Sequence, residues 1–272
     1  MYRLVVSDLD GTLLNSKKQI SKRTVKAIQH LKRKNVLFVA ATGRSDVMTK
    51  LYFRKLQYGN LVIGCDGAVI RNIETGEVLY EKALPGRTCR KAFEICRNYG
   101  LSYYVFTKDE LVGDNSQNER LLIHQRFNQS VERSDRIPIR FVDDLEEFTK
   151  KHSVYKIAAS HEKKKYLDQV AEILKKEIDA DAIRSGKRVL AIKAKGVSKA
   201  EALCRLVGNL GISLEEVIAF GDEVNDMEML KAAGLGIAME NADDMVKASA
   251  DEITFSNDVD GVARKLEEIF KR

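Results

Sequence analysis

Short apolar runs alternate with segments of helical periodicity at both ends of the chain. The apolar runs have the length of buried strands and occupy residues 4–7, 36–41, 61–64, 217–220 and 236–238. Apolar residues recur at helical spacing in residues 24–34, 46–57, 199–209 and 259–270. Because each strand is apolar along its length, both faces are expected to be covered, and the alternation predicts a parallel sheet between two layers of helices.

The middle of the chain predicts a different arrangement. Residues 68–70 and 78–80 flank Glu74-Thr75-Gly76-Glu77 and predict a hairpin. Beyond it, helical segments at 90–99, 119–128 and 164–177 alternate with strand-like segments at 103–107 and 154–159. These segments predict an α+β insert, and no internal repeat is evident.

The first apolar run ends in two closely spaced acids, within Asp8-Leu9-Asp10-Gly11-Thr12. Carboxylates that face one spot repel each other and are costly to desolvate, so the pair indicates a bound cation or a proton transfer. Glycine permits a sharp turn beside a ligand, and the Thr12 hydroxyl can fix a carboxylate. The alternative is a strand followed by an ordinary polar turn, where Asp and Gly are common for conformational reasons.

Two further segments carry polar or basic groups, and the first of them suits a phosphate. The second apolar run ends in Thr42-Gly43-Arg44, where a hydroxyl, backbone amides and a cation could hold phosphate oxygens. A strand-to-helix turn with a capping Thr is the alternative for this segment. Lys199 begins a helical segment after Lys193-Ala194-Lys195-Gly196-Val197-Ser198, although a lysine in such a segment is usually solvated.

A fourth segment again places clustered acids after an apolar run, in Gly221-Asp222-Glu223-Val224-Asn225-Asp226. A calcium loop is the competing metal site. The spacing lacks the alternating oxygen ligands and the terminal Glu of an EF-hand. Metal-assisted phosphoryl chemistry is therefore the favoured hypothesis.

These four segments, in this order, closely resemble the signature motifs of the haloacid dehalogenase-like superfamily of phosphotransferases. Residues 229–242 and 256–263 are similar to the Cof-type subgroup, which contains many sugar-phosphate phosphatases. The resemblance implies a Rossmann-like, doubly wound parallel-sheet core formed by residues 1–82 and 187–272. It also implies an inserted α+β cap domain, residues 83–186, that selects the substrate.

The resemblance implies hydrolysis of phosphate monoesters through a covalent aspartyl phosphate. Asp8 matches the nucleophile, and Asp10 matches the acid that protonates the leaving oxygen and the base that then deprotonates water. The other implied roles are Mg²⁺ binding by Asp8, the backbone carbonyl of Asp10, Asp222 and Asp226, phosphate binding by Thr42, Gly43 and Asn225, and charge neutralisation by Lys199. Arg44 would bind substrate or pin the core to the cap. The implied partner is a small phosphorylated metabolite.

The chain departs from the family pattern at two positions. Asp66 stands where the family commonly has Asn, which places another acid near the expected site and could alter leaving-group preference. Ala200 replaces a glycine, a change that a helix tolerates. A phosphomutase of the same superfamily and a catalytically silent binding module remain alternatives to the phosphatase. The intact acids, lysine and threonine favour an enzyme.

Composition agrees with a soluble enzyme of about two domains, since 272 residues with 44% hydrophobic residues can form substantial cores. No apolar run approaches the roughly 18–20 residues of a membrane helix, and no signal peptide is evident, so a cytoplasmic protein without a membrane partner is expected. The four cysteines form no Cys-x-x-Cys pair and are predicted to be free thiols in the core.

The net charge of +6 is concentrated in the middle of the chain. Residues 82–190 hold 22 Lys and Arg against 17 Asp and Glu, whereas the remainder holds 24 against 23. Attraction of anionic substrates is one explanation, and an ordinary basic surface is the favoured one. No groove-reading motif accompanies the charge, so a nucleic-acid partner is not predicted. A protein partner is not predicted either.

Overall fold

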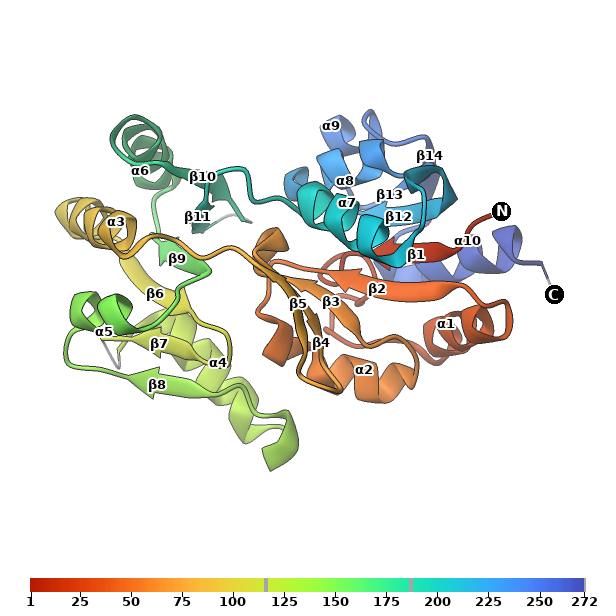
Figure 1. The fold of residues 1–272 in the computed structure, drawn as a ribbon, viewed down its shortest axis with the longest axis horizontal. Helices are drawn as coiled ribbons and strands as arrows, with labels where there is room; N and C mark the ends of the chain where they lie inside the picture. Colours follow the sequence, from red (N-terminus) through yellow and green to blue (C-terminus); the bar gives the residue numbers. More distant parts are fainter. Residues whose placement is uncertain (115–116, 186–187, 272) are drawn as a thin grey trace. The chain divides into compact units, whose positions relative to one another are not determined.

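The computed structural model describes residues 1–114, 117–185 and 188–271, which form two compact units (Figure 1). The core unit comprises Met1–Tyr80 and Ser198–Arg272. The insert unit comprises Glu81–Val197. Each unit has its own sheet and its own apolar core.

The described residues of the core unit form an eight-stranded sheet in the order β14-β13-β12-β1-β2-β3-β4-β5. The strands are β1 (Leu4–Ser7), β2 (Leu37–Ala41), β3 (Leu61–Gly64), β4 (Val69–Asn72), β5 (Val78–Glu81), β12 (Val217–Gly221), β13 (Leu235–Met239) and β14 (Glu252–Thr254). Neighbours from β14 to β3 run parallel, whereas β4 is antiparallel to β3. The predicted parallel sheet is confirmed, and β4 and β5 are neighbours, as the predicted hairpin requires.

Helices cover both faces of the core sheet (Figure 1). They are α1 (Lys22–Arg33), α2 (Lys50–Leu56), α7 (Lys199–Leu210), α8 (Met227–Ala232), α9 (Asp244–Lys247) and α10 (Gly261–Ile269). In β1, Val5 belongs to the same apolar cluster as Leu266 of α10, whereas Leu4 belongs to the cluster that contains Leu203 of α7. Successive strand residues thus enter opposite cores, which explains the uninterrupted apolar run and confirms the doubly wound α/β fold.

The insert unit contains a second sheet, in the order β10-β11-β9-β6-β7-β8. Its elements are α3 (Gly86–Asn98), β6 (Ser102–Phe106), β7 (Leu111–Gly113), α4 (Glu119–Gln129), β8 (Ile139–Phe141), α5 (Leu145–Lys151), β9 (Lys156–Ser160), α6 (Lys164–Glu177), β10 (Ala180–Arg184) and β11 (Val189–Ala194). Phe93 of α3, Phe148 of α5 and Leu167 of α6 share one apolar cluster with Ile157 of β9. These three helices therefore cover one face of the insert sheet.

The chain returns to the core unit later than the sequence indicated. The predicted change of domain lies between residues 186 and 187, whereas the structure places it between Val197 and Ser198. The reason is β11, which is hydrogen-bonded to β9 and β10 and therefore belongs to the insert sheet. The roles of the two units as catalytic core and substrate-selecting cap remain predictions.

Two further expectations concerned free cysteine thiols in the core and the lack of a membrane-spanning helix. All four cysteines are free, as predicted, and three are buried, but Cys204 is exposed and fills no core. Within the part of the chain that the structure describes, no helix is long and apolar enough to cross a membrane.

Candidate active site

The polar segments predicted from the sequence lie at the carboxyl edge of the core sheet. β1 lies between β12 and β2, and Ser7 is in register with Phe220 on one side and Ala40 on the other. Asp8, Thr42 and Asp222 follow the ends of these three neighbouring parallel strands. Open parallel sheets bind ligands beyond this edge.

Lys199 lies buried between two carboxylates. Its Nζ donates to Asp8 Oδ1 at 2.5 Å and to Asp226 Oδ1 at 2.7 Å, and no side chain of the three is more than 7% exposed. Lys199 is the first residue of α7, and the Ser198 hydroxyl caps the first turn of that helix. Gly67 packs so closely on Ser198 that a Cβ would overlap the Ser198 carbonyl group. This packing fixes the start of α7 and, with it, the position of Lys199.

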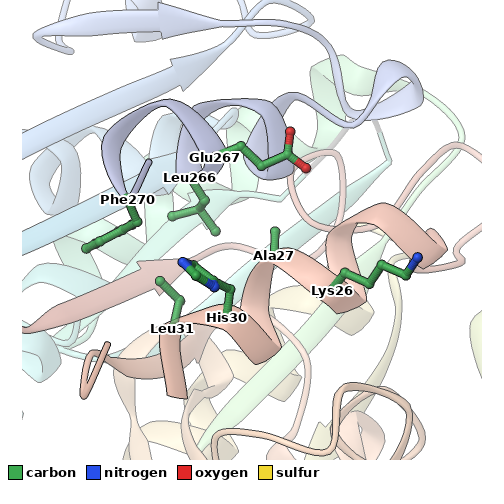
Figure 2. Close-up of a pocket in the computed structure, with 7 residues that line it drawn as sticks. All are labelled: Lys26, Ala27, His30, Leu31, Leu266, Glu267 and Phe270. Carbon is green, nitrogen blue, oxygen red and sulfur yellow. The ribbon is translucent and has the colours of Figure 1, made fainter. Parts of the chain in front are cut away.

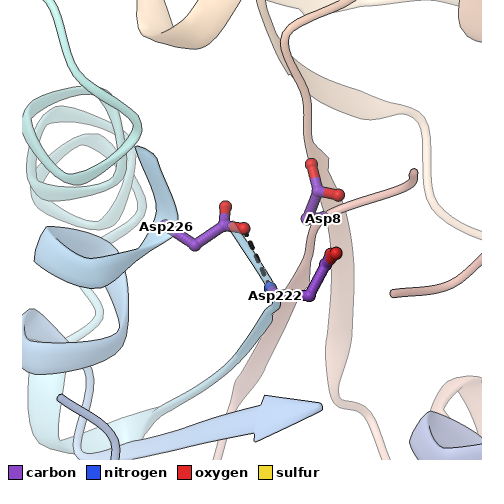
Figure 3. Close-up of side chains that lie close together, drawn as sticks. All are labelled: Asp8, Asp222 and Asp226. Atoms are coloured by element: carbon purple, nitrogen blue, oxygen red, sulfur yellow. Dashed lines mark hydrogen bonds between the residues drawn. The ribbon is translucent and has the colours of Figure 1, made fainter. Parts of the chain in front are cut away.

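Asp222 completes a group of three carboxylates with Asp8 and Asp226 (Figure 3). One oxygen from each lies within 4.8 Å of the other two. Asp226 also accepts a hydrogen bond from the Asp222 N–H at 3.0 Å. Thr12 Oγ1 donates to Asp222 Oδ1 at 2.5 Å, so this hydroxyl fixes a carboxylate. Gly11, with φ of +91°, permits the approach, because a Cβ there would overlap the Asp222 carboxylate.

Burial and mutual repulsion shift the pKa values of this group. Burial raises the pKa of Asp8 well above its usual value, and although Lys199 lowers it, Asp226 and Asp222 add to the rise. Burial raises the pKa of Asp222 to about 7 despite the Thr12 hydrogen bond, with further contributions from Asp226 and Glu223. Burial would lower the pKa of Lys199, but Asp226 and Asp8 raise it, so its ammonium stays charged. One ammonium therefore faces three carboxylates, which favours the entry of a cation.

The donor set of this group fits Mg²⁺. Magnesium prefers oxygen ligands at about 2.0–2.1 Å, so ligand oxygens around one ion lie about 3–4 Å apart. The mutual distances among the oxygens of Asp8, Asp222 and Asp226 are compatible with that spacing. Further coordination by the backbone carbonyl of Asp10 remains a prediction.

Asp10 forms a second cluster with two cations. Arg44 donates from Nε to Asp10 Oδ2 at 2.6 Å and from Nη2 to Asp10 Oδ1 at 2.7 Å, and Lys18 Nζ lies 2.7 Å from Asp10 Oδ1. Burial would raise the pKa of Asp10, but the hydrogen bonds and charges of Arg44 and Lys18 hold it well below its usual value. Asp10 is therefore ionised in this arrangement. It could accept a proton as it stands, whereas donating one would first require release from these cations.

The predicted phosphate-binding residues lie near the same sheet edge. Thr42 Oγ1 accepts a hydrogen bond from the Arg44 N–H at 3.1 Å, and its own hydrogen can be donated elsewhere. Asn225 Nδ2 donates to Asp66 Oδ1 at 2.8 Å, so one of its two N–H groups is engaged. Phosphate binding by Thr42, Gly43 and Asn225 remains a prediction.

Two residues of the site have contacts that the sequence did not indicate. Lys18 lies in a loop beside another lysine, and the sequence around it did not indicate a contact with Asp10. Asp66 was noticed as an unexpected acid, but not as the partner of Asn225. Asp66 is 2% exposed and has a left-handed φ of +57°, so the turn after β3 holds its carboxylate in place.

A small hollow on the core unit lies away from these residues, between α1 and α10 (Figure 2). His30, Leu31, Leu266 and Phe270 contribute to its lining. Its volume of about 20 Å³ accommodates about one water molecule, so it is too small for a metabolite. This hollow therefore offers no alternative to the residues at the carboxyl edge of the core sheet.

Comparison with known proteins gives matches along both units. A profile of proteins described as haloacid dehalogenase-like hydrolases matches residues 5–266. A putative phosphatase of Haemophilus influenzae is 30% identical over 273 residues, covering 99% of each chain. Pyridoxal phosphate phosphatase YbhA of Escherichia coli is 27% identical over 263 residues, covering 96% of each chain. A solved haloacid dehalogenase-like hydrolase from Bacteroides thetaiotaomicron has a TM-score of 0.85 at 33% identity and covers 99% of this chain and 100% of its own.

Proposed function

The chain belongs to the haloacid dehalogenase-like hydrolases, and we propose that it is a magnesium-dependent phosphatase that hydrolyses small phosphate monoesters through a covalent aspartyl phosphate. Sugar phosphates and related metabolites are the proposed substrates. The observation that carries this proposal is the group of Asp8, Asp222 and Asp226 around the buried Lys199. A nucleophile, cation ligands and a neutralising lysine are the parts that phosphoryl transfer requires.

Mg²⁺ would be held by the carboxylates of Asp8, Asp222 and Asp226. When bound, the ion would neutralise negative charge between the nucleophile and the phosphate. The raised pKa values of Asp8 and Asp222 support this assignment, because a cation in the group would relieve the repulsion that contributes to them.

The hydrolysis has two steps. In the first, the Asp8 carboxylate attacks phosphorus, the bond from phosphorus to the leaving oxygen breaks, and Asp10 protonates that oxygen. In the second, Asp10 takes a proton from water, the water oxygen attacks phosphorus, and the Asp8 carboxylate and inorganic phosphate are released. Lys199 would neutralise charge on the transferring phosphoryl group, while the Thr42 hydroxyl and the Gly43 N–H would donate to its oxygens.

The contacts of Asp10 must change before the first step of the hydrolysis can take place. Asp10 can carry a proton only after Arg44 and Lys18 release its carboxylate. An anionic substrate would compete with Asp10 for these two cations, which provides a physical reason for the release. Arg44 would then contact substrate, one of the two roles that the sequence suggested for it.

We propose that the insert unit determines which leaving groups the enzyme prefers. All the residues proposed to handle the phosphate belong to the core unit, so discrimination among the remaining parts of the substrate falls to Glu81–Val197. Pyridoxal phosphate, named for one relative, is a phosphate monoester of the proposed size class. Such metabolites are present in the cytoplasm, where we expect the protein to act.

A panel of phosphate monoesters tests the proposed activity. With Mg²⁺, the purified protein should release inorganic phosphate from at least one small ester, and removal of divalent cations with EDTA should abolish the release. Bisphosphate-dependent isomerisation without net release would instead identify a phosphomutase. Neither reaction across the panel would indicate a silent binding module.

Replacement of Asp222 by Asn tests the metal assignment. We expect the Mg²⁺ concentration for half-maximal activity to rise roughly ten- to a hundredfold, because an amide is a weaker ligand for this ion than a carboxylate. Glu228→Gln removes the same charge from an exposed position on α8 and should leave the magnesium dependence unchanged. A magnesium titration of Asp222→Asn that overlays the wild-type curve would contradict the assignment.

A further inference from the structure

The core unit contains a buried ion pair close to the turn that is proposed to bind phosphate. Asp46 is the first residue of the short helix η1 (Asp46–Thr49) and follows Arg44 by two residues. Arg71 lies on β4, and its Nη1 donates to Asp46 Oδ2 at 2.8 Å. The Asp46 side chain is 1% exposed and that of Arg71 is 8% exposed. Both charges are therefore almost completely removed from water.

Arg71 projects from an apolar face of the core sheet. It is in register with Val62 of β3, so the two side chains are on the same face. Val62 belongs to the apolar cluster that also contains Tyr52 and Phe53 of α2. Burial raises the pKa of Asp46, although Arg71 lowers it, so the ionised carboxylate is costly at this position. A buried ion pair of this kind adds little stability, since apolar residues of similar volume often serve as well or better.

Backbone hydrogen bonds join the phosphate-binding turn to the end of β3. The Thr42 N–H donates to the Ile63 carbonyl at 2.8 Å, and the Cys65 N–H donates to the Arg44 carbonyl at 2.7 Å. These bonds attach both ends of the turn to β3 and to the residue that follows it. Asp46 comes two residues later, and its ion pair attaches the chain to β4 as well. The pair therefore fixes the side of the turn from which η1 begins.

The same ion pair affects the side chain of Arg44. The Arg44 Cζ lies 5.5 Å from the centre of the Tyr52 ring on α2. Because α2 begins directly after η1, the place of Tyr52 depends on where η1 starts. Thr49 Oγ1 donates to the Asp46 carbonyl at 2.6 Å, which ties η1 to that starting residue. A displacement of Asp46 would therefore reach Arg44 both through the chain and through Tyr52.

We propose that Asp46 and Arg71 are positioning residues for phosphate binding, because their ion pair holds the Thr42-Gly43-Arg44 turn in the arrangement that the phosphate oxygens require. This inference rests on the proposed phosphatase function. Both residues act through the turn, and neither is assigned a contact with the substrate. A buried pair that adds little stability but specifies one geometry suits such a place. Small displacements matter there, because an error of about 1 Å can lower the rate about 10²-fold.

Replacement of the ion pair by apolar side chains tests the proposal on the full chain. In Asp46→Leu/Arg71→Met both members are removed together, so neither charge is left buried alone, and we expect a folded protein whose Tm does not fall. Its kcat/KM for a small phosphate ester should fall about 10- to 100-fold, mainly through a higher KM. The inhibition constant of inorganic phosphate should rise by a similar factor, because the same turn would bind the product. The Mg²⁺ concentration for half-maximal activity should not change, since the carboxylates proposed to hold the ion are not part of the turn.

Two further variants separate positioning from general effects. Arg23→Met/Glu267→Leu makes the same kinds of substitution at an ion pair between α1 and α10, and it should leave KM and the inhibition constant unchanged. Arg71→Lys retains a positive charge beside Asp46 and should keep KM close to that of the wild type. Circular dichroism should confirm that each variant is folded. If Asp46→Leu/Arg71→Met does not fold, Asp46→Asn takes its place, and KM should still rise, because the amide keeps an acceptor for Arg71 but not the charge.

Wild-type values of KM and of the inhibition constant in the folded variant would overturn the positioning role without affecting the proposed function. A rise in the Mg²⁺ requirement as large as the rise in KM would also overturn it, because the damage would then extend beyond the turn. If the wild type hydrolyses no ester, the proposed function fails, and calorimetric titration with inorganic phosphate and Mg²⁺ then decides the positioning role. Tighter phosphate binding by the wild type than by the variant would support it, and equal or absent binding would refute it.

Discussion

Replacement of Asp8 by Asn should reduce magnesium-dependent phosphate release by about 10⁴-fold or more, because the amide cannot act as the nucleophile that accepts the phosphoryl group. The same change should leave the fold intact. Asn has nearly the shape of Asp, and its Oδ1 can still accept the hydrogen bond from Lys199. Burial raises the pKa of Asp8, so the ionised side chain costs stability, and we expect the Tm of the variant in metal-free buffer not to fall.

The experiment compares initial rates of phosphate release for wild type, Asp8→Asn and Asp244→Asn. Asp244 is an exposed acid of α9, so its replacement controls for the loss of one negative charge and should leave the rate unchanged. Mass spectrometry before and after the assay excludes deamidation of the new Asn back to Asp. A folded, undeamidated Asp8→Asn protein with turnover near that of wild type would rule out the covalent mechanism.

The core sheet could be predicted from the sequence because burial on both faces leaves a clear pattern. β1, β2, β3, β12 and β13 all coincide with apolar runs, since successive residues of a strand enter cores on opposite sides of the sheet. β14 was missed for the same physical reason. It is an edge strand, and of its three residues only Thr254 is buried, so its sequence contains no apolar run.

The insert unit ends later in the chain than predicted, and the reason is again an edge strand with a weak sequence pattern. β10 is the edge strand of the insert sheet, and its Ala180 and Ala182 alternate with partly exposed residues. That short pattern is weak, so neither β10 nor its pairing with β11 was predicted. β11 precedes Lys199, and its membership in the insert sheet depends on pairing with β9, which the sequence does not reveal.

The sequence predicted which residues gather at the candidate site, but not the contacts that they make with one another. The common sheet edge of Asp8, Thr42 and Asp222 follows from parallel strands that end in polar residues. The contacts made there depend on the paths of loops and helices. Arg44 was expected to contact the substrate or to join the two units, yet in the structure it binds Asp10 through two hydrogen bonds.

Replacement of Lys199 by Ala should lower activity by about 10²- to 10³-fold, because the transferring phosphoryl group loses a preorganised positive charge. It should also lower the free energy of unfolding by about 3–5 kcal/mol in metal-free buffer, since Asp8 and Asp226 would remain buried without their shared cation. Mg²⁺ should restore part of the lost stability by balancing the carboxylates. It should restore little of the activity, because it does not replace the ammonium beside the phosphate.

Urea unfolding and initial rates, each with and without Mg²⁺, separate these two effects of Lys199. Lys231→Ala removes an exposed lysine of α8 and should change neither quantity. If Lys199→Ala does not fold without metal, Lys199→Met, which retains the apolar stem, gives the comparison. Full activity in a folded variant would exclude the neutralising role. Unchanged stability together with lost activity would show that the ammonium does not balance Asp8 and Asp226 in the fold, and that it acts on the phosphoryl group alone.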